Sequence, residues 1–136
     1  MEEIVCGAAS VVSKKELSKR TLGIGVAGVD QKFISNCSPI IFIRYFFIRK
    51  WLLTRYSHAF VILPGGIGTA DEFFELLDLM RHAKIEQHPI ILFGREYWKD
   101  LVSWYYDTAM KQGFISQKRH VPFIVVDDIQ NVMELL

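Results

Sequence analysis

The chain has 136 residues, a length that suits one domain with a substantial hydrophobic core. Hydrophobic residues make up 51% of it and charged residues 23%, a composition that is typical of globular proteins and excludes a disordered chain. Sixteen basic residues against fifteen acidic ones give a net charge of +1, which lacks the basic excess typical of a nucleic-acid-binding protein, so no nucleic-acid partner is predicted, although this balance leaves room for a local basic patch.

Short β-branched runs alternate along the chain with longer amphipathic runs. Their periodicity predicts, in chain order, a helix at 2–12, strands at 21–27 and 40–45, a helix at 46–56, a strand at 59–63, a helix at 70–82, a strand at 89–93, a helix at 97–112, a strand at 122–126 and a last short helix ending at 136. Gly113 stands where a glycine ends a helix, and Asp128 where a side chain caps the last one.

Alternating strands and helices predict βαβ units, and therefore an α/β fold with a mainly parallel sheet covered on both faces. No repeat, low-complexity tract or linker divides the sequence, so we predict a single domain over 1–136. In such sheets ligands bind beyond the carboxyl ends of the strands.

Several features predict a cytoplasmic protein without a membrane segment. The most apolar region, 39–63, is interrupted by four basic residues and reads as core, because a spanning helix needs about 20 nearly uninterrupted apolar residues. The sequence opens Met-Glu-Glu, with no visible signal peptide. Cys6 and Cys37 have no Cys-x-x-Cys spacing and are expected to be reduced thiols.

One loop combines the expected position with chemistry. The segment Pro64-Gly65-Gly66-Ile67-Gly68-Thr69 runs from the end of an apolar strand into a helix, with Glu72 just behind it. Glycines let the backbone approach a ligand, and the start of a helix offers unpaired N–H groups and the positive end of its dipole. The loop is therefore suited to a phosphate, with the Thr69 hydroxyl as an additional donor.

The pattern of this loop differs from the commonest phosphate-binding motifs. A P-loop requires a lysine after its last glycine, and this loop has none. A dinucleotide fingerprint requires a third glycine or alanine, which is also missing here. A phosphate is thus favoured over a pyrophosphate. The competing interpretation is structural, since Thr69-Ala70-Asp71-Glu72 also fits a capping box, in which Glu72 folds back onto the Thr69 amide.

A second feature is the pair Arg49-Lys50, on the helix before the apolar strand. Adjacent βα units could bring this pair beside the glycine loop, where Arg would suit bidentate contact with a phosphate and Lys a point-charge contact. The alternative is a solvated helix face.

Other chemistries have little support in the sequence. The histidines show no metal-ligand spacing, no Gly-x-Ser-x-Gly elbow is present, and we expect no metal or cofactor. The histidines are expected to be surface or capping residues: His58, His82, His88 and His120. The aromatic residues from Tyr97 to Tyr106 are expected to form core and interface.

Arg49-Lys50 followed by Ser57-His58-Ala59-Phe60-Val61-Ile62-Leu63 and then by Pro-Gly-Gly-x-Gly-Thr-x-x-Glu at 64–72 resembles the Lonely Guy family. Its members are cytokinin-activating nucleoside 5′-monophosphate phosphoribohydrolases, long called possible lysine decarboxylases. The segment Pro89–Gly94 with Tyr97-Trp98 also looks like the longer bacterial branch of that family.

The resemblance implies a Rossmann-like three-layer sandwich and hydrolysis of the N-glycosidic bond of a nucleoside 5′-monophosphate. It implies Arg49 and Glu72 as the catalytic pair. By the same resemblance the substrate-binding residues are those of the phosphate loop and the lysine beside Arg49: Lys50, Gly65, Gly66, Ile67, Gly68 and Thr69. It further implies a homodimer that acts on a small molecule.

The sequence departs from the family at its beginning. Met1-Glu2-Glu3 aligns with the end of a second glycine-rich segment of the family, so we expect an N-terminally truncated fold that lacks the first βα unit. This departure keeps an alternative open: a non-catalytic nucleotide- or cofactor-binding protein of the molybdenum-cofactor-carrier type. A third possibility is a structural module whose loop is only a tight turn.

Overall fold

The computed structural model describes residues 22–28 and 39–136. The chain divides into two compact units, residues 1–53 and 54–136, and each is described by itself. The helix predicted at 2–12 and the cysteines Cys6 and Cys37 lie outside the described residues. Organisation of the chain as one domain stays a prediction.

In the first unit, strands β1 (Gly23–Val26) and β2 (Ile40–Ile43) pair in parallel, with Gly23 opposite Ile40 and Val26 opposite Ile43. Helix α3 (Phe46–Arg55) begins three residues after β2. These elements confirm the strands predicted at 21–27 and 40–45 and the helix predicted at 46–56.

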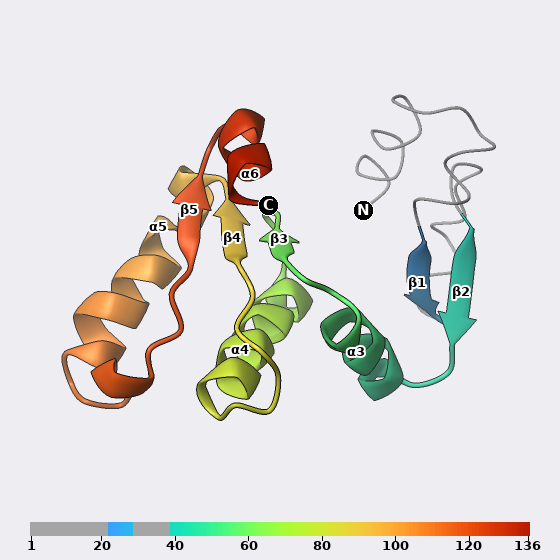
Figure 1. The fold of residues 1–136 in the computed structure, drawn as a ribbon, viewed down its shortest axis with the longest axis horizontal. Coiled ribbons are helices and arrows are strands. Elements are labelled where there is room, and N and C mark those ends of the chain that lie inside the picture. The colour runs from blue at the N-terminus through green and yellow to red at the C-terminus, as the bar shows by residue number, and fades with distance from the viewer. Residues whose placement is uncertain (1–21, 29–38) are drawn as a thin grey trace. The chain divides into compact units, whose positions relative to one another are not determined.

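In the second unit, three parallel strands form a sheet in the order β3-β4-β5 (Figure 1). The strands are β3 (Phe60–Ile62), β4 (Ile90–Phe93) and β5 (Ile124–Val126). All three fall within the predicted strands and, with helices between them, confirm the α/β class and its Rossmann-like parallel arrangement. Because the strands are parallel, their carboxyl ends lie at one edge of the sheet.

Some helix ends of the second unit lie close to the predicted positions, and others differ from them. They are α4 (Ile67–Arg81), α5 (Arg95–Ser103) continued by a π-helical stretch (Trp104–Met110), a 3₁₀ turn (Gln117–Arg119) and α6 (Ile129–Leu135). The predicted helix at 97–112 is thus α-helical only in its first part. The backbone φ of +82° at Gly113 confirms that this residue ends the helix.

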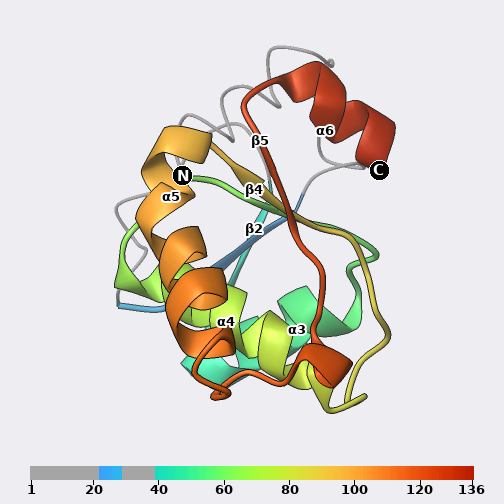
Figure 2. The same cartoon turned by 90° about the vertical axis from the view of Figure 1, so that its left-hand side faces the viewer.

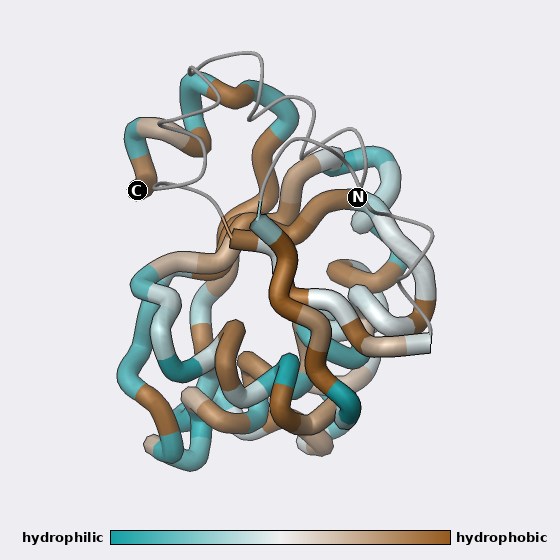
Figure 3. Tube along the Cα trace, turned by 90° about the vertical axis from the view of Figure 1, so that its right-hand side faces the viewer, coloured by the Kyte–Doolittle hydropathy of each residue, from teal (hydrophilic) through white to brown (hydrophobic). Residues whose placement is uncertain are grey.

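The two faces of the β3-β4-β5 sheet carry different helices (Figure 2). On one face, Ile62, Ile90 and Leu92 pack with residues of α4 and α5, among them the buried Phe73 and Trp98. On the other, the fully buried Ile91 packs with Val126 and with Val132 of α6. Burial on both faces explains why β4 is a continuous apolar run. Figure 3 colours the trace by hydropathy, and hydrophobic stretches in brown alternate along it with hydrophilic stretches in teal.

The outer edge of β5 is covered by Arg95, the first residue of α5. Its guanidinium Nη2 donates to the Val125 carbonyl at 2.8 Å, and its Nε lies 3.4 Å from Asp127 Oδ2. The neighbouring Val126 carbonyl accepts from Gly94 N at 2.8 Å, on the β4 side. Carbonyls alternate in direction along a strand, so the Val125 carbonyl faces outward and Arg95 satisfies it.

Candidate functional site

The glycine loop connects the carboxyl end of β3 to the start of α4, the position predicted from the sequence. The capping residue of α4 is Gly66, whose backbone is extended (φ −81°, ψ −159°), and no side chain caps the helix. The helix therefore begins three residues earlier than predicted, at Ile67. The capping-box interpretation is wrong for this reason: Thr69 is already inside the first turn, and its N–H donates to the Gly66 carbonyl at 3.0 Å.

The three loop glycines differ in what a side chain at each position would meet. A Cβ on Gly65 would overlap the Thr69 hydroxyl oxygen and lie 2.9 Å from Thr69 Cβ, so the packing of the loop itself demands glycine there. A Cβ on Gly66 or on Gly68 would meet no atom within 4 Å. The space beside these two residues is open, and the backbone is accessible from it. Among the three loop glycines, these two are the ones whose missing side chains leave room for a ligand.

The start of α4 also differs from the starts of α5 and α6 in how its backbone N–H groups are capped. At α5, Arg95 N donates to Asp127 Oδ1 at 2.6 Å, and at α6, Gln130 N donates to Asp128 Oδ1 at 2.9 Å. The second contact confirms Asp128 as a capping residue. At each of these two helices a side-chain carboxylate accepts from a backbone N–H of the first turn, whereas Gly66, the capping residue of α4, has no side chain that could cap the helix. An external anion would find its favourable position at α4.

The loop is held from α5 by a residue to which the sequence analysis gave no role at this site. The hydroxyl of Tyr97, in the first turn of α5, donates to the Gly65 carbonyl at 2.5 Å. Beside it, a Cβ on Gly94 would lie 3.3 Å from Pro64 Cγ, so the two loops that follow β3 and β4 are in close contact. The available signal was the order of the strands, since β3 and β4 are neighbours whose carboxyl ends share one edge.

Glu72 lies on α4, three residues after Thr69 and four after Gly68. Residues at these spacings share a helix face, and helical side chains lean toward the N-terminus of the helix. Its neighbour Phe73 is fully buried and contacts the rings of Trp98 and Phe123, with centroids 6.4 and 5.2 Å away, which fixes the rotation of α4. Glu72 is half-buried and shares a side of α4 with Gly68 and Thr69.

Arg49 and Lys50 both lie on α3, as predicted, and both side chains are half-buried. Arg49 and Lys50 belong to the first unit, whereas the glycine loop and Glu72 belong to the second. The meeting of Arg49 with Glu72 stays a prediction. What the structure places on one loop and helix start is the set Gly65, Gly66, Ile67, Gly68, Thr69 and Glu72.

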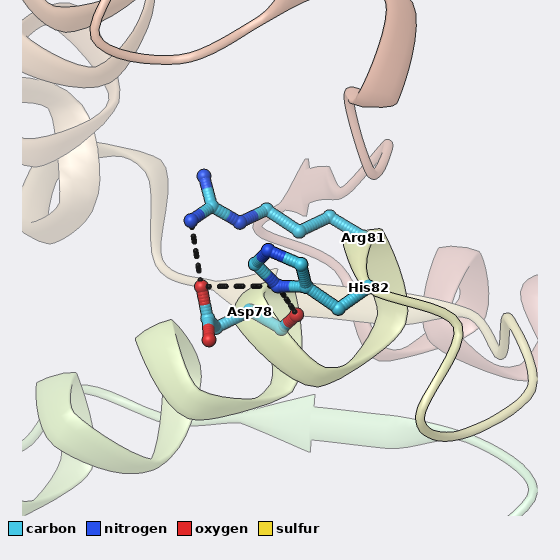
Figure 4. A network of polar contacts seen from close by, with 3 residues as sticks. All are labelled: Asp78, Arg81 and His82. Carbon is cyan, nitrogen blue, oxygen red and sulfur yellow. Dashed lines mark hydrogen bonds and ion pairs between the residues drawn. The ribbon is translucent and has the colours of Figure 1, made fainter.

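Two of the histidines, His82 and His120, make contacts with neighbouring structural residues. His82 caps the end of α4, its Nδ1 lying 2.9 Å from the Asp78 carbonyl oxygen, while Arg81 Nη2 lies 2.9 Å from Asp78 Oδ1 (Figure 4). His120 Nε2 contacts the Tyr106 hydroxyl at 3.2 Å. Across 22–28 and 39–136, no group of three histidine, cysteine or acidic side chains is arranged to hold a metal ion.

The described tyrosines and aspartates with shifted pKa values lie on the helix after β4. Burial raises the pKa of Tyr105 and of Tyr106 above the usual value of 10. Hydrogen bonds from Lys111 and Ser103 lower the pKa of Asp107. Trp98 and Tyr105 are buried, as the predicted core role requires, whereas Tyr97 and Trp104 are about half exposed. None of the helices within the described ranges combines the length and apolar character that a membrane crossing demands.

Comparison with known proteins identifies a family and several relatives that this chain resembles. Residues 4–136 match the family described as "Possible lysine decarboxylase". The chain is 38% identical, over 62% of its own length and 42% of the relative's, to a cytokinin riboside 5′-monophosphate phosphoribohydrolase of Rhodococcoides fascians. Two enzymes of the same name from Arabidopsis thaliana are 37% and 38% identical over 54% and 50% of this chain, and over 34% and 31% of their own lengths.

The aligned part therefore spans less than half of each of these relatives. The family match, in contrast, covers nearly all of this chain and includes both Arg49-Lys50 and the loop at 64–72. The sequence resemblance to the Lonely Guy proteins is thereby confirmed: this chain belongs to the possible lysine decarboxylase family.

Proposed function

We propose that the chain acts as a nucleoside 5′-monophosphate phosphoribohydrolase. Water replaces the base at C1′ of the ribose, so that the glycosidic N–C bond breaks, the base leaves with its bonding electrons and takes up a proton, and ribose 5-phosphate remains. The substrate would be of the AMP or cytokinin riboside monophosphate type. The observation that carries this proposal is the uncapped start of α4 behind open glycines, with Glu72 on the same helix.

The 5′-phosphate would bind at the beginning of α4. Gly66 and Gly68 leave the backbone accessible, and the N–H groups of the first turn would donate to the phosphate. Ile67 N–H and the Thr69 hydroxyl add donors. Lys50 would contribute a point charge to the same anion.

The reaction needs a negative charge near the ribose, because breaking the glycosidic bond builds positive charge on the sugar. The Glu72 carboxylate would stabilise this charge and orient or deprotonate the attacking water. Arg49 would steady the ribose or phosphate, or assist the departing base, through its planar set of donors. No cofactor is needed for this chemistry.

The names of the relatives favour an enzyme over a non-catalytic carrier. All three relatives are named phosphoribohydrolases, and none is named as a carrier of the molybdenum cofactor. The activity of the whole protein is nevertheless part of the proposal, because the aligned part of this chain spans less than half of each relative. We extend the proposal to a homodimer that works in the cytoplasm.

The proposal is tested by incubating the chain with AMP and a panel of other nucleoside monophosphates and measuring the release of free base. We expect Glu72→Gln and Arg49→Ala each to abolish release while AMP still binds. Two matched substitutions control for loss of charge alone: Glu86→Gln, on the loop after α4, and Arg55→Ala, on the last turn of α3. Release by Glu72→Gln at the rate of the unchanged protein would rule out the assigned role. Nucleotide binding without release by the unchanged protein would indicate a carrier.

A further inference from the structure

Tyr97 contacts the glycine loop from the first turn of α5, through a hydrogen bond of its hydroxyl, and its side chain is 54% exposed. Its ring packs edge-on against Trp98, with centroids 4.9 Å apart and planes at 84°. Trp98 is 2% exposed, and its indole Nε1 donates to the Phe93 carbonyl at 3.1 Å. The start of α5 is further held by the contact of Arg95 N with Asp127. The hydroxyl of Tyr97 thus reaches Gly65 from a helix turn that is anchored through Trp98 and Arg95.

The peptide that Tyr97 contacts joins two glycines, Gly65 and Gly66, and glycines restrict rotation of a peptide plane less than other residues do. The described chain contains no cis peptide bond. In a trans peptide the carbonyl and the following N–H point in opposite directions. A hydrogen bond to the Gly65 carbonyl therefore also sets the direction of the Gly66 N–H, which points away from Tyr97.

We propose that Tyr97 is a positioning residue for phosphate binding, whose hydroxyl holds the Gly65–Gly66 peptide with its N–H turned toward the anion. If the plane turned over, the Gly65 carbonyl would face the phosphate in place of the N–H, and two negative groups would meet. This inference rests on the phosphate-binding part of the proposed function, and it is independent of the hydrolytic step.

The chain offers a matched control for the hydroxyl. Tyr106 lies on the helical continuation of α5, and its hydroxyl also makes a hydrogen bond, to His120 Nε2 at 3.2 Å, without touching the glycine loop. Tyr97→Phe and Tyr106→Phe each remove one oxygen atom and one such bond. Only Tyr97→Phe is expected to change the ligand site.

The experiment measures the affinity of the full chain for ribose 5-phosphate, which keeps the phosphate and lacks the glycosidic bond, and for adenosine, which lacks the phosphate. We expect Tyr97→Phe to bind ribose 5-phosphate about three- to tenfold more weakly, the range for loss of one neutral hydrogen bond. Binding of adenosine should be unchanged. Tyr106→Phe should match the unchanged protein with both ligands. In the kinetics, KM for the nucleotide should rise in Tyr97→Phe at nearly constant kcat, because the phosphate is held alike in ground and transition states.

Equal affinity of Tyr97→Phe and the unchanged protein for ribose 5-phosphate would overturn the inference. So would absence of ribose 5-phosphate binding in the unchanged protein, since the loop would then hold no phosphate. If the unchanged protein binds ribose 5-phosphate and releases no base from any nucleotide, the proposed hydrolysis fails, and the ratio of affinities still decides the role of Tyr97.

Discussion

The hydroxyl of Tyr97 donates to the carbonyl of Gly65, so the first turn of α5 is tied to the loop that opens α4. Both residues follow neighbouring parallel strands, β3 and β4. The loop is thereby held by two kinds of constraint. Tyr97 acts on it from outside, and the Thr69 side chain fills the space beside Gly65 from inside.

Gly65 and Gly66 should respond differently to alanine. Gly65→Ala is expected to lower the free energy of unfolding by about 1–3 kcal/mol, because the new Cβ collides with Thr69. Gly66→Ala should change that free energy by no more than about 0.5 kcal/mol, since its Cβ enters open space, and should weaken phosphate binding by obstructing the anion. Urea unfolding and titration with ribose 5-phosphate measure the two effects. Unchanged affinity in Gly66→Ala would contradict the binding position.

Phe73→Ala should be among the most destabilising substitutions in α4. The side chain is fully buried and contacts Phe74, Trp98 and Phe123, and removal of a buried phenylalanine costs about 3–5 kcal/mol. Thermal unfolding should show the loss. Phe114→Ala, at a side chain that is 77% exposed, serves as the control and should have little effect.

The carboxylates at the starts of α5 and α6 should each contribute to stability. Asp127→Ala removes the acceptor of Arg95 N, and Asp128→Ala removes the acceptor of Gln130 N. We expect each substitution to cost about 1 kcal/mol, the usual size of a capping interaction, in a denaturant titration. If Asp128→Ala loses stability and Asp127→Ala does not, the contact at α5 contributes nothing measurable.

Tyr105 should make the folded chain sensitive to alkali. Its pKa is raised in the folded chain, chiefly because burial disfavours the phenolate. The stabilising contribution is therefore fully present below the unfolded value of about 10, and is lost as the pH rises through the folded value. Unfolding midpoints between pH 8 and pH 12 should fall more steeply for the unchanged protein than for Tyr105→Phe, and equal slopes would count against this assignment.

The sequence predicted the strands well because their signals are local. Ala59-Phe60-Val61-Ile62-Leu63 is a continuous apolar run ended by Pro-Gly-Gly, and β3 lies inside it. The start of α4 was misplaced because Thr69 has the chemistry of a capping residue, while Gly66, which takes that position, has no side chain to show it. The π-helical stretch after Ser103 has no local signal either.

The candidate site was predictable to the extent that it lies within one segment. Gly66, Gly68 and Glu72 are close in sequence, so the spacing alone indicated their common location. Tyr97 comes 32 residues after Gly65, and only the pairing of β3 with β4 brings the two loops together. A contact of this kind depends on the register of the sheet, which periodicity does not specify.

The guanidinium of Arg95 on the Val125 carbonyl has a consequence for how chains meet one another. An exposed outer strand offers unpaired main-chain groups on which a foreign strand can align, which is a common route to aggregation. A chain that approached β5 in this way would first have to displace Arg95, which also contacts Asp127. Arg95→Ala should therefore increase turbidity on heating, as the uncovered border of β5 begins to recruit other molecules.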